Sequence, residues 1–311
     1  MLDVRRLRVL HAVSEYGTVT AAAAALGYTA PAVSQQLAAL ERETGVRLTE
    51  RAGRGIELTP AADILVAHAA ALLTRLDAAE ADIAALRDQV AGRVTLAAFP
   101  SAAAALVPDT WRALREHAPH VTIELEEMEP EESLPAVLRG DADIAIAHEY
   151  DLLPRPLDPL FERRDLLDDP LLVALPATDP STDPSTDLAA DQGQDHDTVD
   201  LASLAGRPFL APRRATSCAE LIQRACARAG FVPAVTARAT DFHVLLSLVA
   251  AGAGVALVPR LAAGRLPDGV VLRTPAQPVT RKIFTVSRRG GDRRPAVRVV
   301  LDTVAEQARG R

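Results

Sequence analysis

The chain has 311 residues, of which 49% are hydrophobic, so it is long enough for two domains with separate cores, and global disorder is excluded. Its formal net charge of −7 excludes a general electrostatic attraction to nucleic acid, and its two cysteines are too few for a disulfide scaffold. The N-terminus lacks the apolar segment of a signal peptide, and the longest apolar run, Val244–Pro259, is too short to cross a bilayer. We therefore expect a cytoplasmic protein with no membrane partner.

Residues 18–59 predict two helices joined by a tight turn and followed by a short β-hairpin. Thr18 is a suitable N-cap for an alanine-rich helix, and Gly27 supplies the positive φ of the turn that ends it. Thr29 can cap the second helix, with Pro31 in its first turn, where a missing N–H costs little. This succession predicts a winged helix-turn-helix, an element that binds DNA.

The second helix of this unit has an apolar inner face and a small polar outer face. Val33, Leu37 and Leu40 fall on the inner face. Hydroxyl and amide groups on the outer face can meet base edges and phosphates in the major groove, and arginines of the hairpin can reach the backbone or the minor groove. The candidate DNA-binding residues are Thr29, Pro31, Ser34, Gln35, Arg51 and Arg54. The alternative is a plain three-helix scaffold.

A long helix with one apolar seam is predicted from Pro60 to Val90, a stretch without glycine or further proline, with Thr59 as its cap. Apolar residues recur at alternating steps of four and three, which is a heptad pattern. The seam consists of Leu65, Ala69, Leu72, Leu76, Ala79, Ile83, Leu86 and Val90. The residues expected to join two copies of the chain are Leu65, Leu72, Leu76, Ile83 and Leu86. Packing of the helix on the chain's own C-terminal domain is the alternative.

From Gly92 onward, β-like runs alternate with helical ones, which indicates an α/β region in two subdomains. The predicted strands are Val94–Phe99, Val121–Glu126, Ile144–Ala147, Leu171–Leu175, Pro208–Leu210, Ala234–Ala237, Gly254–Val258 and Lys282–Val286. The predicted helices are Ala103–His117, Glu131–Arg139, Cys218–Ala229, Phe242–Ala251 and Pro295–Ala308.

A family pattern runs through the first sixty residues: Leu7 to Gly17, Thr18, Ala22, Ala23, Leu26, Pro31-Ala32-Val33-Ser34, Leu40-Glu41, Gly45, Leu48, Arg51 and Leu58-Thr59-Pro60. It closely resembles the N-terminal pattern of LysR-type transcriptional regulators, and the rest of the chain resembles that family more loosely. Ala30 replaces the usual Gln before the helix proline, Thr49 replaces an aromatic, and Ala62 replaces a usual Gly. The first departure removes one expected base or phosphate contact.

The resemblance implies an α/β fold class with an all-α winged helix-turn-helix domain at residues 1–59. A linker and dimerisation helix would follow at 60–91, and an effector-binding domain like periplasmic binding proteins at 92–311. Lobe I would comprise about 92–162 and 268–311, and lobe II about 163–267, with crossings near Phe161–Arg164 and Gly264–Gly269 and the final helix back in lobe I. The implied partners are double-stranded DNA with an interrupted inverted repeat, a small-molecule effector and further copies of the chain, as a homodimer or a dimer of dimers.

Residues 177–200 contain a short Thr-Asp-Pro-Ser repeat in which an aspartate recurs at every fourth position: Asp179, Asp183, Asp187, Asp191 and Asp195. On a helix these carboxylates would form a repelling column, and Pro180 and Pro184 interrupt any helix. We therefore expect a solvated, disordered loop. Calcium binding is the alternative, although the Gly and terminal Glu of an EF-hand pattern are absent.

The candidate effector site follows from where α/β folds place ligands, which is beyond the carboxyl ends of strands and at helix N-termini. Ser101 follows the first predicted strand of this region and opens the next helix; in LysR-type proteins a Ser or Thr at this place commonly contacts the effector. Residues after other predicted strands are expected to line the same cleft: Glu129, His148, Arg213, Thr216 and Asp241. Because a guanidinium suits carboxylate or phosphate, we expect a small polar or anionic effector. Ordinary capping or a surface charge is the alternative for each residue.

Two other functions were weighed. The chain has no GxSxG, HExxH or GxxxxGK[ST] motif, and closeness in sequence does not make a triad of Asp241 and His243, so we expect no enzyme, no cofactor and no metal. A thiol-based redox-sensing regulator is the sharper alternative, because Cys226 and Cys218 resemble the cysteine pair of peroxide-sensing LysR-type proteins. Their spacing differs, and it puts the two Cα atoms about 12 Å apart on a helix, beyond disulfide reach unless the helix melts. We expect buried or incidental cysteines.

Overall fold

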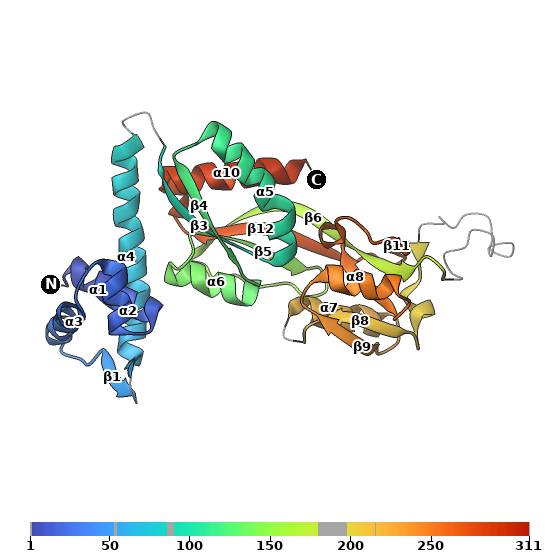
Figure 1. The fold of residues 1–311 in the computed structure, drawn as a ribbon, viewed down its shortest axis with the longest axis horizontal. Helices are drawn as coiled ribbons and strands as arrows, with labels where there is room; N and C mark the ends of the chain where they lie inside the picture. The colour runs from blue at the N-terminus through green and yellow to red at the C-terminus, as the bar shows by residue number, and fades with distance from the viewer. Residues whose placement is uncertain (1, 53–54, 86–89, 180–197, 215, 311) are drawn as a thin grey trace.

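The computed structural model describes residues 2–52, 55–85, 90–179, 198–214 and 216–310. A small helical unit and a long helix stand beside a two-lobed α/β body (Figure 1). Three of the sequence predictions lie outside the described residues, namely those for Arg54, Leu86 and residues 180–197, and the side chains of Arg51 and Ile83 are likewise not described. The ends of the predicted loop 177–200 are ordered, because Asp179 is buried in an ion pair with Arg207 and Thr198 begins the strand β7.

The N-terminal unit consists of α1 (Val4–Tyr16), α2 (Val19–Leu26), α3 (Ala30–Thr44) and the hairpin strands β1 (Thr49–Ala52) and β2 (Gly55–Leu58). The predicted caps are confirmed, since Thr18 Oγ1 accepts a hydrogen bond from Ala21 N at 3.1 Å and Thr29 Oγ1 accepts one from Ala32 N at 3.4 Å. Gly27 adopts a φ of 67°, the left-handed conformation that the turn requires.

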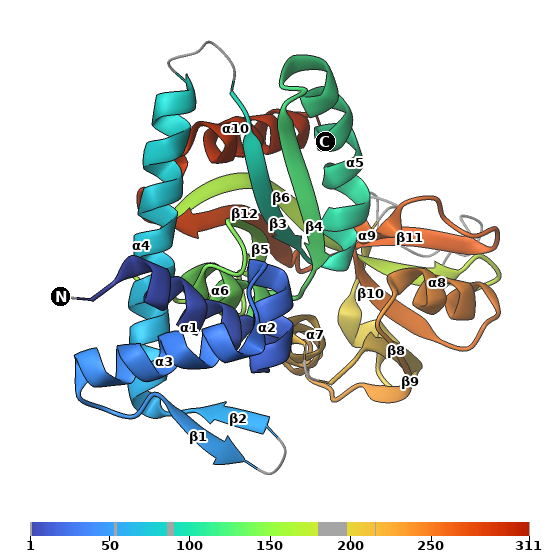
Figure 2. The same ribbon diagram turned by 60° about the vertical axis from the view of Figure 1, so that its left-hand side comes forward.

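The inner face of α3 holds this unit together. Val33, Leu37 and Leu40 are buried in one core with Leu7 and Leu10 of α1. With its apolar residues turned inward, α3 keeps its polar face toward solvent, and the β1–β2 hairpin projects beside it (Figure 2).

Helix α4 (Pro60–Ala85) begins as predicted, with Thr59 Oγ1 accepting a hydrogen bond from Ala62 N at 3.3 Å. Its first turns complete the core of the N-terminal unit: Ala69 is fully buried there, and Leu65 packs against the same core. Ala69 of the predicted seam is therefore covered within its own chain, while Leu65 is only partly buried, and its place in a dimer seam stays a prediction. The heptad spacing identifies an apolar face but not the partner that covers it.

The later part of the predicted seam is uncovered. Leu72 and Leu76 keep 45% and 46% of their surface exposed, although both are large apolar side chains. The opposite side of α4 packs on the α/β body, with contacts to α6 and α10. Packing on the chain's own C-terminal domain is thus observed for one face of α4, and association through the exposed face stays a prediction.

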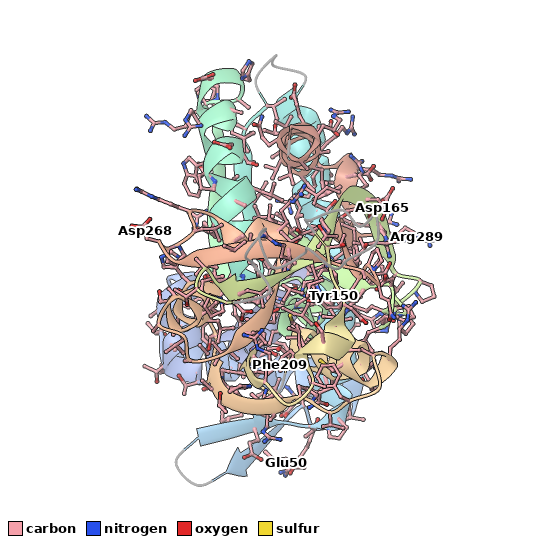
Figure 3. The ribbon with its side chains drawn as sticks, turned by 90° about the vertical axis from the view of Figure 1, so that its right-hand side faces the viewer. Glu50, Tyr150, Asp165, Phe209, Asp268 and Arg289 are labelled. Carbon is pink, nitrogen blue, oxygen red and sulfur yellow. The ribbon has the colours of Figure 1, made fainter. Side chains whose placement is uncertain are left out.

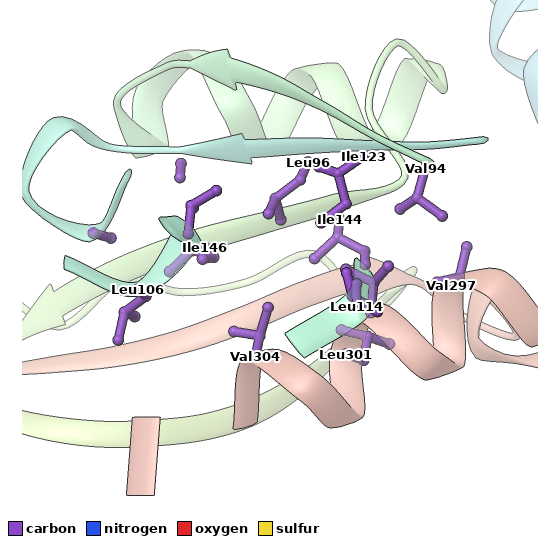
Figure 4. Close-up of a cluster of buried hydrophobic side chains, with 14 of the residues drawn as sticks. Val94, Leu96, Leu106, Leu114, Ile123, Ile144, Ile146, Val297, Leu301 and Val304 are labelled. Carbon is purple, nitrogen blue, oxygen red and sulfur yellow. The ribbon is translucent and has the colours of Figure 1, made fainter. Parts of the chain in front are cut away.

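Lobe I contains β3 (Gly92–Ala98), α5 (Pro100–His117), β4 (Val121–Glu127), α6 (Pro130–Arg139), β5 (Ile144–Tyr150), the first part of β6 (Phe161–Pro176), β12 (Thr280–Arg288), the 3-10 turn η3 (Gly291–Arg293) and α10 (Pro295–Arg309). Its strand order is β4-β3-β5-β12-β6. Side chains such as Val94 and Ile144 from the strands pack against Leu301 and Val304 of α10 (Figure 4). Helix α6 covers the other face of this sheet, with Val137 buried against Phe284.

Lobe II contains the second part of β6, β7 (Thr198–Val199), the 3-10 turn η2 (Leu201–Leu204), β8 (Pro208–Pro212), α7 (Ser217–Arg228), β9 (Ala234–Ala239), α8 (Phe242–Ala250), β10 (Val255–Pro259), α9 (Arg260–Ala263) and β11 (Val270–Pro275). Strands β10, β8 and β9 follow β6 in order, while β11 pairs with the other edge of β6. Parallel pairing of β10 with β8 and of β8 with β9 brings their carboxyl ends to one edge of the lobe.

Strand β6 runs through both lobes without a break. Its residues 161–170 pair with β12, and residues 171–176 pair with β10 and β11. The first crossing therefore lies near Pro170 and not near Phe161–Arg164. The second lies between β11 and β12, at residues 276–279, and not near Gly264–Gly269. The lobe boundaries move by the same amounts, while the last helix does return to lobe I, as its packing on α5 shows.

The early part of β6 was missed because it is charged. It forms an edge of the lobe I sheet, where charged side chains are common in strands. Arg163 pairs with Glu149 and Asp165 at 2.7 Å, and Arg164 pairs with Asp302 at 3.0 Å. Of these partners, Asp302 lies 138 residues away in the chain, beyond the reach of any local pattern.

The C-terminal end of α6 touches the N-terminal unit. Nε2 of His11, on α1, lies 3.2 Å from the carbonyl oxygen of Arg139. The next residue is Gly140, with a φ of 88°, where an added Cβ would stand 3.2 Å from Cβ of Ala70 on α4. This close approach joins α6 to both α1 and α4.

Among the described residues, no helix has the length and apolar character needed to cross a membrane.

Candidate functional site

The outer face of α3 is open to solvent. Ser34 and Gln35 are exposed side by side in its second turn, and Pro31 is exposed in the first. Thr29 caps the helix while also remaining exposed. The backbone of Arg51 pairs with Ile56 across the hairpin, which places this residue in the wing. The structure thus gathers the described members of the predicted DNA-binding set on one side of the N-terminal unit.

A cavity of about 250 Å³ lies between the two lobes. Lobe I contributes the start of α5, the residue before α6 and the end of β5. Lobe II contributes the residues after β8, the starts of α7 and α8, and α9. All the residues predicted from strand ends line this one cavity: Ser101, Glu129, His148, Arg213, Thr216 and Asp241.

A buried ion pair forms the floor of the site. Arg281 of β12 and Asp169 of β6 are each only 2% exposed, and their Nη2 and Oδ2 atoms lie 2.6 Å apart. The same Nη2 donates to Ser101 Oγ at 2.9 Å, and the guanidinium lies 4.8 Å from the centre of the Phe99 ring. The other oxygen of Asp169, Oδ1, accepts a hydrogen bond from Leu261 N of lobe II at 2.9 Å. One ion pair therefore holds groups from both lobes.

Glu129 and His148 form the lobe I wall of the cavity. Glu129 Oε2 lies 3.6 Å from His148 Nε2. Burial raises the pKa of Glu129, and the nearby Glu131 carboxylate raises it further. Burial lowers the pKa of His148 well below its ordinary value, and the positive charges of Arg281 and Arg155 act in the same direction. The imidazole is therefore neutral at physiological pH.

Tyr150 stands where the lobes meet. It belongs to β5 of lobe I, yet its ring packs in the core of lobe II with Phe209 and Cys218; Tyr150 and Phe209 are both labelled in Figure 3. The rings of Tyr150 and His148 lie 5.1 Å apart, in an edge arrangement. The Tyr150 hydroxyl interacts with the Cys218 side chain, whereas His148 Nδ1 is buried without a hydrogen-bond partner among the described residues.

The lobe II wall of the cavity contains two helix N-cap residues and one arginine without an ion pair among the described residues. Thr216 Oγ1 accepts from Ala219 N at 3.3 Å at the start of α7, and Asp241 Oδ1 accepts from His243 N at 2.8 Å at the start of α8. These contacts are ordinary caps in addition to their place in the cavity. The Asp241 carboxylate accepts its hydrogen bond from the backbone N–H of His243. In a catalytic triad the carboxylate would accept from the histidine ring instead. Arg213 is exposed at the cavity, and its side chain makes no ion pair with the described residues.

Sequence reasoning did not assign the other lining residues to the cavity, among them Tyr150, Cys218 and Arg281. Arg281 is the most consequential, because it contacts the predicted Ser101. The available signal was an arginine inside a β-like run, but its partner Asp169 is 112 residues away in the chain. No local sequence pattern connects Arg281 with Asp169.

Both cysteines lie on α7 and are buried. Burial raises the pKa of Cys218 to about 11 and the pKa of Cys226 to about 12. At neutral pH only about one Cys218 side chain in ten thousand is a thiolate, the form that reacts with peroxides. Intact α7 keeps the two thiols apart, so the structure offers no route to a disulfide between them.

Comparison with known proteins identifies the family. Residues 4–63 match the model of the bacterial regulatory helix-turn-helix protein, lysR family, and residues 87–309 match the LysR substrate binding domain. The chain belongs to the LysR family of transcriptional regulators. The predicted fold class and the predicted role of a DNA-binding regulator with an effector domain are thereby confirmed.

Relatives of this LysR-family regulator cover almost its whole length. The probable regulator LrrA of Synechococcus elongatus is 28% identical over 307 residues, covering 99% of this chain and 98% of LrrA. IlvR of Caulobacter vibrioides is 30% identical over 263 residues, 83% of this chain and 82% of IlvR.

Solved structures share the fold. A cysteine-to-aspartate variant of full-length OxyR from Pseudomonas aeruginosa has a TM-score of 0.79 at 22% identity, covering 98% of this chain and 95% of that one. Full-length CbnR complexed with its target DNA has a TM-score of 0.59 at 25% identity, covering 98% and 100%.

The ion pair yields a stability prediction. Arg281→Met leaves the Asp169 carboxylate buried without its partner, so the free energy of unfolding should fall by about 3–5 kcal/mol in urea titration. Arg281→Met with Asp169→Leu should cost less than the sum of the single changes. As a control, Arg112→Met removes a pair with Asp109 in which the arginine is exposed, and should cost at most about 1 kcal/mol. Equal losses from Arg281→Met and Arg112→Met would contradict this reading.

The thiols yield a second prediction. Because their raised pKa values keep both protonated, neither Cys218 nor Cys226 should react with Ellman's reagent in the folded protein at neutral pH. In urea both should react, which serves as the control. Pretreatment of the folded protein with mild peroxide should leave that total unchanged. Loss of both thiols from the folded protein under peroxide would instead support redox sensing.

Proposed function

We propose that this LysR-family regulator binds its operator through α3 and the β1–β2 wing, and that a small polar effector in the cavity between the lobes modulates this binding. The observation that carries the proposal is the convergence of six polar side chains, three from each lobe, on one cavity. A ligand there contacts both lobes and so favours the arrangement that it fits best. We assign the chain no catalytic role, and we place its action in the cytoplasm with the DNA it regulates.

The proposed DNA-binding set is the predicted one, with Ser34 and Gln35 toward the bases and Arg51 and Arg54 on the backbone. The exposed polar face of α3 supports the first two positions. Placement of Arg51 in the wing supports the third.

We propose assembly through α4. Leu72 and Leu76 are large apolar side chains left half-exposed along one helix face, and a second copy of α4 is the simplest cover for them. Two copies of α4 packed in this way are related by a twofold axis. The two N-terminal units related by this axis match an interrupted inverted repeat, and two such dimers would form a tetramer.

Thiol-based redox sensing is not proposed for this chain. The likeness to OxyR lies below 25% identity and describes the fold. The burial of both thiols and their raised pKa values argue against a reactive cysteine.

DNA recognition can be tested on a duplex selected from random sequence by the wild-type protein. Gln35→Ala should weaken binding to this duplex by about 1–3 kcal/mol and relax the preference at one base pair, because an amide can hydrogen-bond a base edge. Arg54→Ala should weaken binding to all sequences and lower the salt slope by about one unit, as loss of a phosphate contact does. Gln223→Ala, at an exposed position of α7, is the matched control. Unchanged affinity in both test variants would refute the assigned face.

Assembly can be tested by sedimentation. Leu72→Glu places a carboxylate in the proposed seam, so the dimer should dissociate at concentrations where the wild type stays associated, and operator affinity should fall with it. The control is Ala67→Glu, an exposed position on another face of α4. Circular dichroism establishes that both variants fold. A wild-type protein that sediments as a monomer at micromolar concentration would overturn the proposed seam.

A further inference from the structure

The cavity carries opposite charges on its two lobes. Glu129, on lobe I, receives no hydrogen bond at its carboxylate from the described residues, and His148 at 3.6 Å is a neutral neighbour. Arg213, on lobe II, lines the same cavity and forms no ion pair with the described residues. The other cavity arginine, Arg281, is already neutralised by Asp169. Asp241, on lobe II, also lines the cavity, but its carboxylate caps α8. Glu129 is thus the cavity carboxylate without a hydrogen bond, and Arg213 the cavity arginine without an ion pair, among the described residues.

Each of these groups requires a particular ligand chemistry. A partly desolvated carboxylate is stabilised by a cationic donor such as an ammonium, and a further anion near it would be repelled. A guanidinium is best satisfied by a carboxylate through two parallel hydrogen bonds. The ligand that satisfies both walls therefore carries an amino group and a carboxylate.

One further polar atom points to a bound polar molecule. His148 Nδ1 belongs to a residue that is 2% exposed, lines the cavity and lacks a hydrogen-bond partner among the described residues. Unsatisfied buried polar groups are rare in native proteins, and a ligand or water that completes them is a common explanation.

Size limits the ligand further. At about 30 Å³ per water, the cavity of about 250 Å³ has room for about eight water molecules. This is below the range of about 300–1,000 Å³ found for sites of drug-sized ligands. Apolar lining from Phe99, Phe242 and Leu261 leaves one part of this space suited to a small hydrocarbon group.

We propose that the effector is a small zwitterion of the amino acid class, with its amino group at Glu129 and its carboxylate at Arg213. This inference rests on the proposed effector role of the cavity and narrows its ligand from polar or anionic molecules to one chemical class. Because the two anchors lie on different lobes, only a molecule that carries both groups ties the lobes together. A lone carboxylate or a lone amine would engage one lobe only.

The test uses the full-length protein in thermal-shift and calorimetric titrations. The probes are L-alanine, L-serine, L-valine, L-leucine and L-phenylalanine at millimolar concentration. L-valine is compared with isovalerate, which lacks its amino group, and isobutylamine, which lacks its carboxylate; any other amino acid that binds is compared with its own two analogues. At least one amino acid should raise Tm, while neither of its analogues should do so at the same concentration.

Charge-removing variants locate the two anchors. Glu129→Gln and Arg213→Gln should each raise the Kd of the binding amino acid at least about tenfold, since a hydrogen-bonded charge is worth about 1.5–3 kcal/mol. Glu132→Gln and Arg214→Gln, exposed neighbours that do not line the cavity, should leave Kd unchanged.

Three results would overturn the zwitterion. These are stabilisation by the carboxylate analogue equal to that by the amino acid, full binding by Glu129→Gln, and no Tm shift with any of the five amino acids. Operator binding without added ligand is measured on the same preparations. This measurement separates failure of the zwitterion proposal from failure of the proposed regulatory function.

Discussion

The arrangement of the two lobes depends on one buried ion pair. Arg281 and Asp169 sit opposite each other in the β12–β6 ladder, one residue before β6 leaves lobe I. Desolvating two such charges costs several kcal/mol per ion, so the pair is tolerated only with good geometry and further hydrogen bonds. The structure supplies both: the guanidinium also binds Ser101 of lobe I, and the carboxylate also binds the Leu261 amide of lobe II. The point where the chain changes lobes is thus fixed by charge as well as by backbone pairing.

The same pair sets the electrostatics of the cavity. The positive charge of Arg281 opposes protonation of His148, and burial acts in the same direction. Asp169 neutralises the charge of that guanidinium, which leaves Arg213 as the cavity arginine without an ion-pair partner among the described residues. Burial is the main cause of both pKa shifts in the cavity, because it lowers the pKa of His148 and raises the pKa of Glu129. Glu131 raises the pKa of Glu129 further, whereas Arg281 acts against this rise.

Sequence reasoning succeeded where the signal was local. The caps at Thr18, Thr29 and Thr59 involve residues three positions apart, so they could be read directly, and α2, α3 and α4 begin where those caps predict. The cavity residues were also found, because parallel strands deliver their carboxyl ends to a common edge whatever the details of packing. Their roles in binding remain predictions.

The predictions that failed depended on contacts between residues far apart in the chain. The charged start of β6 is a strand because β12 pairs with it, and one of its arginines, Arg164, pairs with Asp302, 138 residues away. Ala69 was placed in the apolar seam, yet it is buried in the core of the N-terminal unit, because an apolar stripe does not reveal what covers each of its residues. Arg281 was overlooked for the same reason: its function is defined by partners brought together only in the folded chain.

Helix α6 connects the cavity to the N-terminal unit. Its N-cap is Glu129, at the cavity, and its last residue, Arg139, meets His11 of the N-terminal unit, with Gly140 against α4. Ten helical residues span about 15 Å and are stiff on this scale, so a displacement at one end reaches the other with little loss. The distance between the cavity and the DNA-binding unit is bridged by a single rigid element within one chain. Within each chain, one helix thus connects the cavity to the N-terminal unit and to α4.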